Sequence, residues 1–149
     1  MARSVNILLV EDDPNDVMLI RKAVQKTLSG TPLAVVSNGQ EAVNYLKGDA
    51  PYTERAIHPF PDIVLLDLKM PLMNGFELLR WIRQQPRLRR LPVIVLTGSV
   101  HESDAILAYE EGANSYLIKP TDFNQLVRTM ETLGNFWMKG SRLPDAGPA

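Results

Sequence analysis

The stretch IVLLDLKMPLMNGFELLRWI, residues 63–82, carries the pattern that decides the fold. Its first four residues are apolar at successive positions, as expected of a strand buried on both faces of a parallel sheet. Asp67 follows where that strand must end, and Met70-Pro71 marks a turn. Apolar residues then recur at helical spacing, at Phe76, Leu79 and Ile82. The stretch therefore predicts a buried strand, an acidic residue at its end, and an amphipathic helix.

The same alternation of apolar runs and helical segments continues along the chain. The apolar runs predict five strands, at Val5–Val10, Leu33–Val36, Ile63–Leu66, Val93–Leu96 and Tyr116–Ile118. Helical stripes separate them, and a last stripe with i, i+3, i+4, i+7 spacing runs from Phe123 to Trp137. Strands that alternate with helices predict a single-domain α/β fold of the (βα)₅ type, with a parallel sheet covered on both faces.

Residues that favour helix ends agree with these boundaries. Asp13 is a suitable N-cap for the first helix, and Pro14 suits the first helical position. Asp16 adds a carboxylate to the first turn, where the helix dipole favours it. We expect Thr121 to cap the last helix, and Gly112 to mark the end of the fourth.

Two segments depart from this compact pattern. Residues 48–61 contain three prolines and predict an irregular surface loop. Residues 139–149 are rich in Gly and Pro and predict a flexible C-terminal tail. We therefore assign residues 1–138 to the folded domain and residues 139–149 to the tail.

Composition and charge narrow the classes of function. A formal net charge of -1 gives no general attraction to nucleic acid or to an anionic membrane. The absence of cysteine excludes disulfides, thiolate metal sites and cysteine nucleophiles. Neither a signal peptide nor a membrane-spanning stretch is recognisable. We expect a cytoplasmic protein that binds neither nucleic acid nor membrane.

Polar residues stand where four of the predicted strands end. They are Glu11 and Asp12 after the first strand, Asp67 after the third, Thr97 and Gly98 after the fourth, and Lys119 after the fifth. Because the carboxyl ends of parallel strands meet at one edge of a sheet, we expect these residues to share one site. Clustered carboxylates favour a hard cation such as Mg²⁺, and an ionised Asp beside Mg²⁺ and Lys is a workable nucleophile towards phosphorus.

Each of these residues also has an ordinary structural explanation. Acidic residues at a helix start stabilise the dipole, and a lone Asp at a strand end is usually a turn or cap residue. Thr97 taken alone fits a strand terminus, and Lys119 taken alone fits a solvated lysine. Their coincidence at successive strand ends favours a phosphoryl site.

Four segments resemble the receiver domains of bacterial two-component response regulators: LLVEDD (8–13), LLDLKMPLMNG (65–75), LPVIVLTGS (91–99) and SYLIKP (115–120). The resemblance covers essentially the whole chain. It implies a flavodoxin-like, doubly wound sheet with strand order 2-1-3-4-5. It also implies that a histidine kinase or a phosphotransfer protein donates a phosphoryl group to Asp67.

The same resemblance implies roles for the neighbouring residues. Glu11, Asp12, Asp67 and the backbone carbonyl of Lys69 would hold Mg²⁺. Thr97 and Lys119 match the switch hydroxyl and the lysine that contacts the phosphoryl group, and the small Gly98 leaves room for backbone amides. Tyr116 matches an aromatic ring that turns inward on phosphorylation, and Lys69 and Ser99 match positions that tune dephosphorylation.

The loop before the third strand and the C-terminal FWMKGSRLP resemble, more narrowly, the small stand-alone receivers paired with bacterial and cyanobacterial phytochromes. This likeness implies a phytochrome kinase as phosphodonor, signalling through protein contacts, and a homodimer through the fourth helix, fifth strand and fifth helix. Phe136 and Trp137 would contribute to that surface. Both aromatics fit the core of the last helix equally well.

Other functions remain open at this point. An aspartyl-phosphate phosphatase also uses a strand-end Asp, Mg²⁺, Thr and Lys, but it needs a second Asp two residues after the nucleophile, where Lys69 stands. An FMN carrier of this fold needs a phosphate loop that three acids after the first strand would disfavour. A receiver-like adaptor that never takes phosphate is a further alternative, although the acceptor and metal acids are all present.

Overall fold

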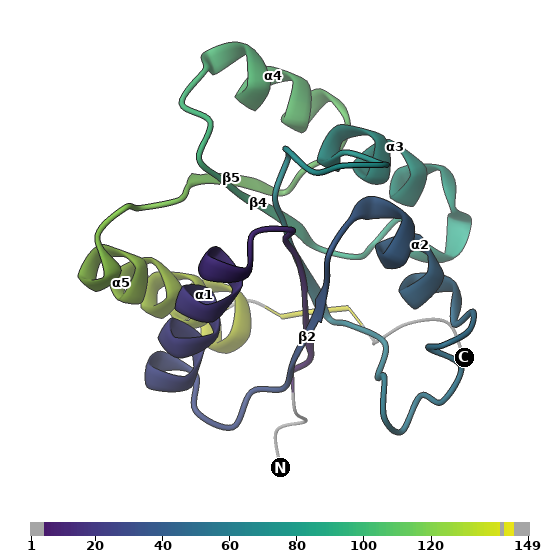
Figure 1. Cartoon of the computed structure of the whole chain (residues 1–149), viewed down its shortest axis with the longest axis horizontal. Helices are drawn as coiled ribbons and strands as arrows, with labels where there is room; N and C mark the ends of the chain where they lie inside the picture. Colours follow the sequence, from purple (N-terminus) through teal and green to yellow (C-terminus); the bar gives the residue numbers. More distant parts are fainter. Residues whose placement is uncertain (1–4, 141, 145–149) are drawn as a thin grey trace.

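The computed structural model describes residues 5–140 and 142–144, and its centre is a five-stranded parallel sheet (Figure 1). The strand order is β2-β1-β3-β4-β5. The strands are β1 (Ile7–Val10), β2 (Leu33–Val36), β3 (Ile63–Leu66), β4 (Val93–Thr97) and β5 (Ser115–Ile118). The predicted fold class and strand order are confirmed, and the strand boundaries differ from the prediction by two residues or fewer.

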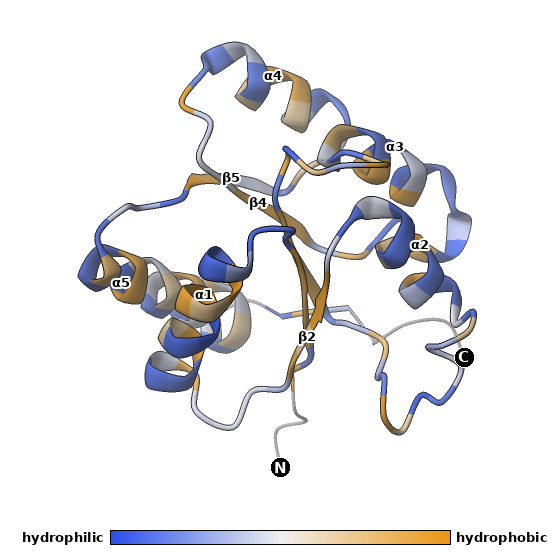
Figure 2. Ribbon diagram, in the orientation of Figure 1, coloured by the Kyte–Doolittle hydropathy of each residue, from blue (hydrophilic) through white to orange (hydrophobic). Residues whose placement is uncertain are grey.

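Successive residues of the central strands point to opposite faces of the sheet. In β1, Ile7 and Leu9 contribute to one hydrophobic cluster, and Leu8 and Val10 contribute to another. The four residues of β3 alternate in the same way, and all eight side chains are buried. Figure 2 shows the hydrophobic strands between helices whose outer surfaces are hydrophilic. Burial on both faces is the physical reason for the continuous apolar runs in the sequence.

The helices lie in two layers around this sheet (Figure 1). On one side, α1 (Pro14–Thr27) packs against α5 (Phe123–Leu133). On the other side, α2 (Gly39–Lys47) packs against α3 (Gly75–Gln84), and α4 (Glu102–Glu110) lies beside α3 and β5. A short 3₁₀ turn, η1 (Pro86–Leu88), follows α3, and a π-helical segment, η2 (Gly134–Gly140), continues α5. In the described part of the chain, no helix has both the length and the apolar character needed to cross a membrane.

The helix ends are as expected, with one exception. Asp13 caps α1 by accepting a hydrogen bond from the Asn15 amide, and Gly112 adopts a φ of 108° just after α4. The predicted cap of α5 was wrong, because Asp122 and not Thr121 accepts from the Asn124 amide. Both residue types cap well. Burial of the apolar stripe sets where α5 begins, and Asp122 is the residue just before that point.

The loop over residues 48–61 contains no helix or strand, but it is held against α2. The Tyr45 hydroxyl of α2 donates a hydrogen bond to the Pro59 carbonyl. The Arg55 guanidinium donates to the carbonyl oxygens of Tyr45 and Leu46, near the end of the same helix. The Tyr52 ring lies 5.0 Å from the Tyr45 ring. An irregular backbone is therefore combined with specific side-chain packing.

The region after α5 is partly packed. Trp137 and Leu143 both pack against the hydrophobic cluster between the sheet and the α1 and α5 helices. Residues 141 and 145–149 of the predicted tail lie outside the described residues. The division of the chain at residues 138 and 139 stays a prediction.

Candidate functional site

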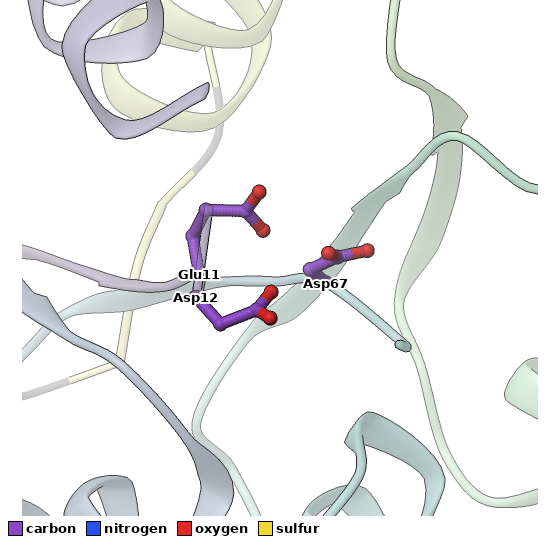
Figure 3. Close-up of side chains that lie close together, drawn as sticks. All are labelled: Glu11, Asp12 and Asp67. Carbon is purple, nitrogen blue, oxygen red and sulfur yellow. The ribbon is translucent and has the colours of Figure 1, made fainter. Parts of the chain in front are cut away.

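Three carboxylates meet at the carboxyl edge of the sheet. Val10 and Leu66 are paired at the ends of the adjacent strands β1 and β3, so the residues that follow them lie side by side. Glu11, Asp12 and Asp67 each offer an oxygen atom within 4.8 Å of the others. Figure 3 shows their carboxylates gathered around one space. The expected juxtaposition of acids from two strand ends is therefore present.

Lys119 reaches this cluster from the end of β5. Its Nζ donates to Oε1 of Glu11 at 3.0 Å and to Oδ2 of Asp16 at 2.8 Å, and it lies 3.8 Å from Oδ2 of Asp67. Its backbone amide donates to the Thr97 carbonyl at 2.6 Å, which joins the end of β5 to the end of β4. Burial lowers the pKa of Lys119, but hydrogen bonds to Asp16 and Glu11 outweigh this effect and raise it.

Glu11 is the most constrained of the three acids. Its side chain is buried, and its Oε2 has no hydrogen-bond partner among the described residues. Burial raises the pKa of Glu11 to about 9, and the neighbouring Asp67 carboxylate adds to this shift. A nearby divalent cation would favour the ionised form and give Oε2 a partner. These oxygen ligands therefore fit a hard divalent cation such as Mg²⁺ or Mn²⁺.

The two oxygens of Asp67 have different surroundings. Oδ1 accepts a hydrogen bond from the Leu68 amide at 2.8 Å, and Oδ2 faces Lys119. The loop after Asp67 folds back tightly, because the Gly75 amide donates to the Leu68 carbonyl at 2.9 Å. A Cβ atom at Gly75 would overlap the Asp67 carbonyl oxygen, so this close approach requires glycine. The arrangement fixes one oxygen and leaves the other directed towards the lysine.

The remaining predicted residues lie around this centre. Thr97 is the last residue of β4 and is buried, and Lys69 is exposed in the loop after Asp67. A Cβ atom on Gly98 would meet no atom within 4 Å, so the space beside that backbone is open. The Ser99 hydroxyl donates to Asp104 of α4, and the Tyr116 hydroxyl donates to the Ser99 carbonyl at 3.0 Å. Tyr116 is thus tied to the segment that leads into α4.

Asp16 is the residue whose position the sequence did not reveal. Its place in the first turn of α1 was explained by the helix dipole alone. In the structure its carboxylate pairs with Lys119, 103 residues away, and the hydrogen bond from Lys119 outweighs burial and lowers the pKa of Asp16. Its position in the first turn of α1 gives no local signal of this long-range pair.

This arrangement of strand-end acids and lysine agrees with the family comparison. The family described as Response regulator receiver domain matches residues 7–131. The chain belongs to this family. This receiver domain is 39% identical over 143 residues to the probable methanogenesis regulatory protein FilR2 of Methanothrix harundinacea (strain 6Ac), covering 96% of this chain and 88% of that protein. It is 35% identical over 140 residues to response regulator Rcp1 of Synechocystis sp. (strain ATCC 27184 / PCC 6803 / Kazusa), covering 94% of this chain and 93% of Rcp1.

Solved structures of phytochrome response regulators resemble this receiver domain closely. The phosphorylated cyanobacterial phytochrome response regulator RcpA has a TM-score of 0.87 and 34% identity, over 96% of this chain and 100% of that one. The Mn²⁺-bound form of Rcp1 has a TM-score of 0.83 and 34% identity, over 94% of this chain and 99% of the Rcp1 chain. The resemblance to this group of receivers, inferred from the sequence, is confirmed.

Proposed function

We propose that this receiver domain accepts a phosphoryl group on Asp67 from the phosphohistidine of a sensor histidine kinase or phosphotransfer protein. The observation that carries the proposal is the position of Asp67, beside the acidic pair that follows β1 and close to the Lys119 ammonium. An anionic nucleophile, a cation site and a fixed positive charge are the parts that phosphoryl transfer requires.

The reaction follows from the surroundings of Asp67. Its Oδ2, which is not held by the backbone, attacks phosphorus and forms a P–O bond. The P–N bond of the donor breaks, and its electron pair stays on the imidazole nitrogen. The product is an acyl phosphate that carries about two negative charges. Lys119, at 3.8 Å from Oδ2, is close enough to offset this charge after a small movement.

Glu11, Asp12, Asp67 and the backbone carbonyl of Lys69 are the proposed ligands of Mg²⁺. When bound, this ion supplies positive charge to the oxygens of the transferring group. Oε2 of Glu11, which has no hydrogen-bond partner in the described part of the chain, supports the assignment, and so does the Mn²⁺ that the related Rcp1 binds.

The proposed switch connects Asp67 to α4. The Thr97 hydroxyl and the amide beside Gly98 would contact the phosphoryl group. Movement of Thr97 would change the packing of Tyr116, whose hydroxyl contacts the Ser99 carbonyl. Because Ser99 is in turn bonded to Asp104, the change would reach α4 and bias an existing two-state equilibrium. Lys69 and Ser99 are the proposed positions that set the rate of dephosphorylation.

The proposed output is a protein contact through the α4-β5-α5 surface, including a homodimer. Phe136 is 61% exposed and packs edge-on against Trp137, while Trp137 also contacts the hydrophobic core. These two residues line a hollow of about 620 Å³ with Leu117 and Pro120. The kinship with RcpA supports a phytochrome kinase as phosphodonor in the cytoplasm.

Labelling by a phosphorylated histidine kinase tests the proposal. Wild-type protein should gain a base-labile phosphoryl group when Mg²⁺ is present and lose this ability in EDTA. Asp67→Asn should remain unlabelled, because an amide is a poor nucleophile. Asp49→Asn, which changes an exposed acid paired with Lys47, is the matched control and should label normally.

Labelling of Asp67→Asn at the wild-type rate would contradict the assignment of the phosphoryl acceptor. Labelling by acetyl phosphate, combined with none by any phytochrome kinase, would contradict only the choice of donor. Rapid multiple turnover of a phosphomonoester would favour a phosphatase. The exposed Lys69 counts against that enzyme, because it stands where a phosphatase places its second acid.

A further inference from the structure

Lys119 is shared between the phosphoryl site and an acid that lies outside it. Asp16, in the first turn of α1, accepts from Nζ at 2.8 Å, the shortest of the three carboxylate distances around this ammonium. The Lys119 side chain is 12% exposed and that of Asp16 is 28% exposed, so the pair is only partly screened by water. This ion pair joins the end of β5 to the start of α1.

The position of Asp16 sets up a competition for the ammonium group. Nζ has three N–H donors, and Asp16 and Glu11 each accept one. Oδ2 of Asp67, at 3.8 Å, is beyond hydrogen-bond distance. A phosphoryl oxygen on Asp67 would attract Nζ towards β3, a movement that would lengthen its contact with Asp16. The contact with Asp16 opposes that movement.

We propose that Asp16 is a positioning residue that holds Lys119 on the α1 side in the unphosphorylated protein. It thereby weakens the binding of a phosphoryl group at Asp67. This inference rests on the proposed function. Asp16 is not among the proposed metal ligands, so it keeps a carboxylate on Lys119 even when a cation draws Glu11 away. A contact made in only one of two states stabilises that state, and its removal shifts the equilibrium to the other.

Beryllofluoride, a stable analogue of the acyl phosphate, tests this role. It is titrated with Mg²⁺ into full-length protein, and binding is followed by the amide NMR signals of Thr97 and Gly98. Asp16→Asn should bind roughly fivefold more tightly than wild type, the size expected for loss of one partly screened ion pair. The same variant should have a lower melting temperature without ligand, because the pair stabilises the unliganded state.

Asp13→Asn is the matched control. It removes one carboxylate from the same helix start, and asparagine retains the N-cap that Asp13 provides to the Asn15 amide. It should change beryllofluoride affinity less than twofold. Asp16→Glu keeps a carboxylate within reach of Lys119 and should restore most of the wild-type affinity. In a Lys119→Gln background, Asp16→Asn should have no further effect.

Two failures can be told apart. If wild-type protein with Asp67 intact takes up no beryllofluoride, the proposed function fails, and the role of Asp16 falls with it. If wild type binds and Asp16→Asn matches Asp13→Asn or binds more weakly, the proposed function stands and the role of Asp16 is overturned. A gain in affinity that persists without Lys119 would also overturn it, because the effect would then be one of general charge.

Discussion

Replacing Glu11 by glutamine should stabilise the metal-free protein at neutral pH. Glu11 is buried, and its burial, together with the neighbouring Asp67 carboxylate, raises its pKa from 4.5 to about 9. The unfolded chain ionises this carboxyl near the lower value. At any pH between these two pKa values, folding is therefore accompanied by the uptake of a proton. The stability that this proton gives is present in full below about pH 4.5 and is lost as pH rises towards 9.

The size of the effect follows from the same shift. Between the two pKa values, each pH unit lowers the free energy of unfolding by about 1.36 kcal/mol. At about pH 7.5, the protonation of Glu11 therefore costs the folded state up to about 4 kcal/mol. Glutamine has no such cost, but its amide oxygen accepts a weaker hydrogen bond from Lys119, a loss of about 1–2 kcal/mol. The net gain is about 2 kcal/mol, which corresponds to a rise in melting temperature of about 4–8 °C for a chain of this size.

Thermal unfolding in EDTA at about pH 5 and about pH 7.5 measures this gain, which should vanish or become a small loss at the lower pH, where the protonation cost falls below the hydrogen-bond loss. Millimolar Mg²⁺ should stabilise the wild type more than Glu11→Gln, because the ion replaces the buried proton. Glu131→Gln, which changes an exposed carboxyl of α5, should have little effect at either pH. A variant that melts at or below the wild-type temperature at the higher pH, or whose gain is independent of pH, would refute the reasoning.

Two further predictions concern the rest of the fold. Arg83→Ala should lower the free energy of unfolding by about 2–3 kcal/mol in denaturant titrations, because its guanidinium donates to the Leu91 and Gly112 carbonyls. Arg80→Ala, which loses an exposed pair with Glu111, should change it little, and equal effects would contradict the role of Arg83. Phe136→Ser should convert a dimer to a monomer in size-exclusion chromatography, because it removes an exposed aromatic ring from the proposed interface. Met18→Ser, which changes an exposed apolar residue of α1 outside that interface, should leave the dimer intact. A monomeric wild type, phosphorylated or not, would contradict the proposed dimer.

Much of the fold and the centre of the site were predictable from the sequence. Buried parallel strands give continuous apolar runs, and their order along the chain, together with the family resemblance, leads to one topology. Because the ends of such strands share an edge, residues that follow β1 and β3 had to lie near each other. Glu11, Asp12 and Asp67 could therefore be identified as site residues from the sequence, and Lys119 followed from its place at the end of β5.

Other features depend on distances between elements that local patterns do not encode. Choosing between Thr121 and Asp122 as a cap required the point at which packing starts α5. Phe136 and Trp137 are adjacent aromatics that each fit a core or an interface, and only the packed structure leaves the first mostly exposed and places the second against the core.

The sequence by itself determined which strands are buried on both faces, in what order the elements come, and which acids stand at the strand ends, because each of these depends on residues close together in the chain. The tertiary structure alone decided that Asp16 pairs with Lys119 and that Glu11 has an oxygen without a partner among the residues that the structure describes. Those properties depend on how α1 is placed over the sheet, and they join residues that are 103 positions apart in the chain. Electrostatic interactions act through space, so they follow the packed arrangement and not the order of residues.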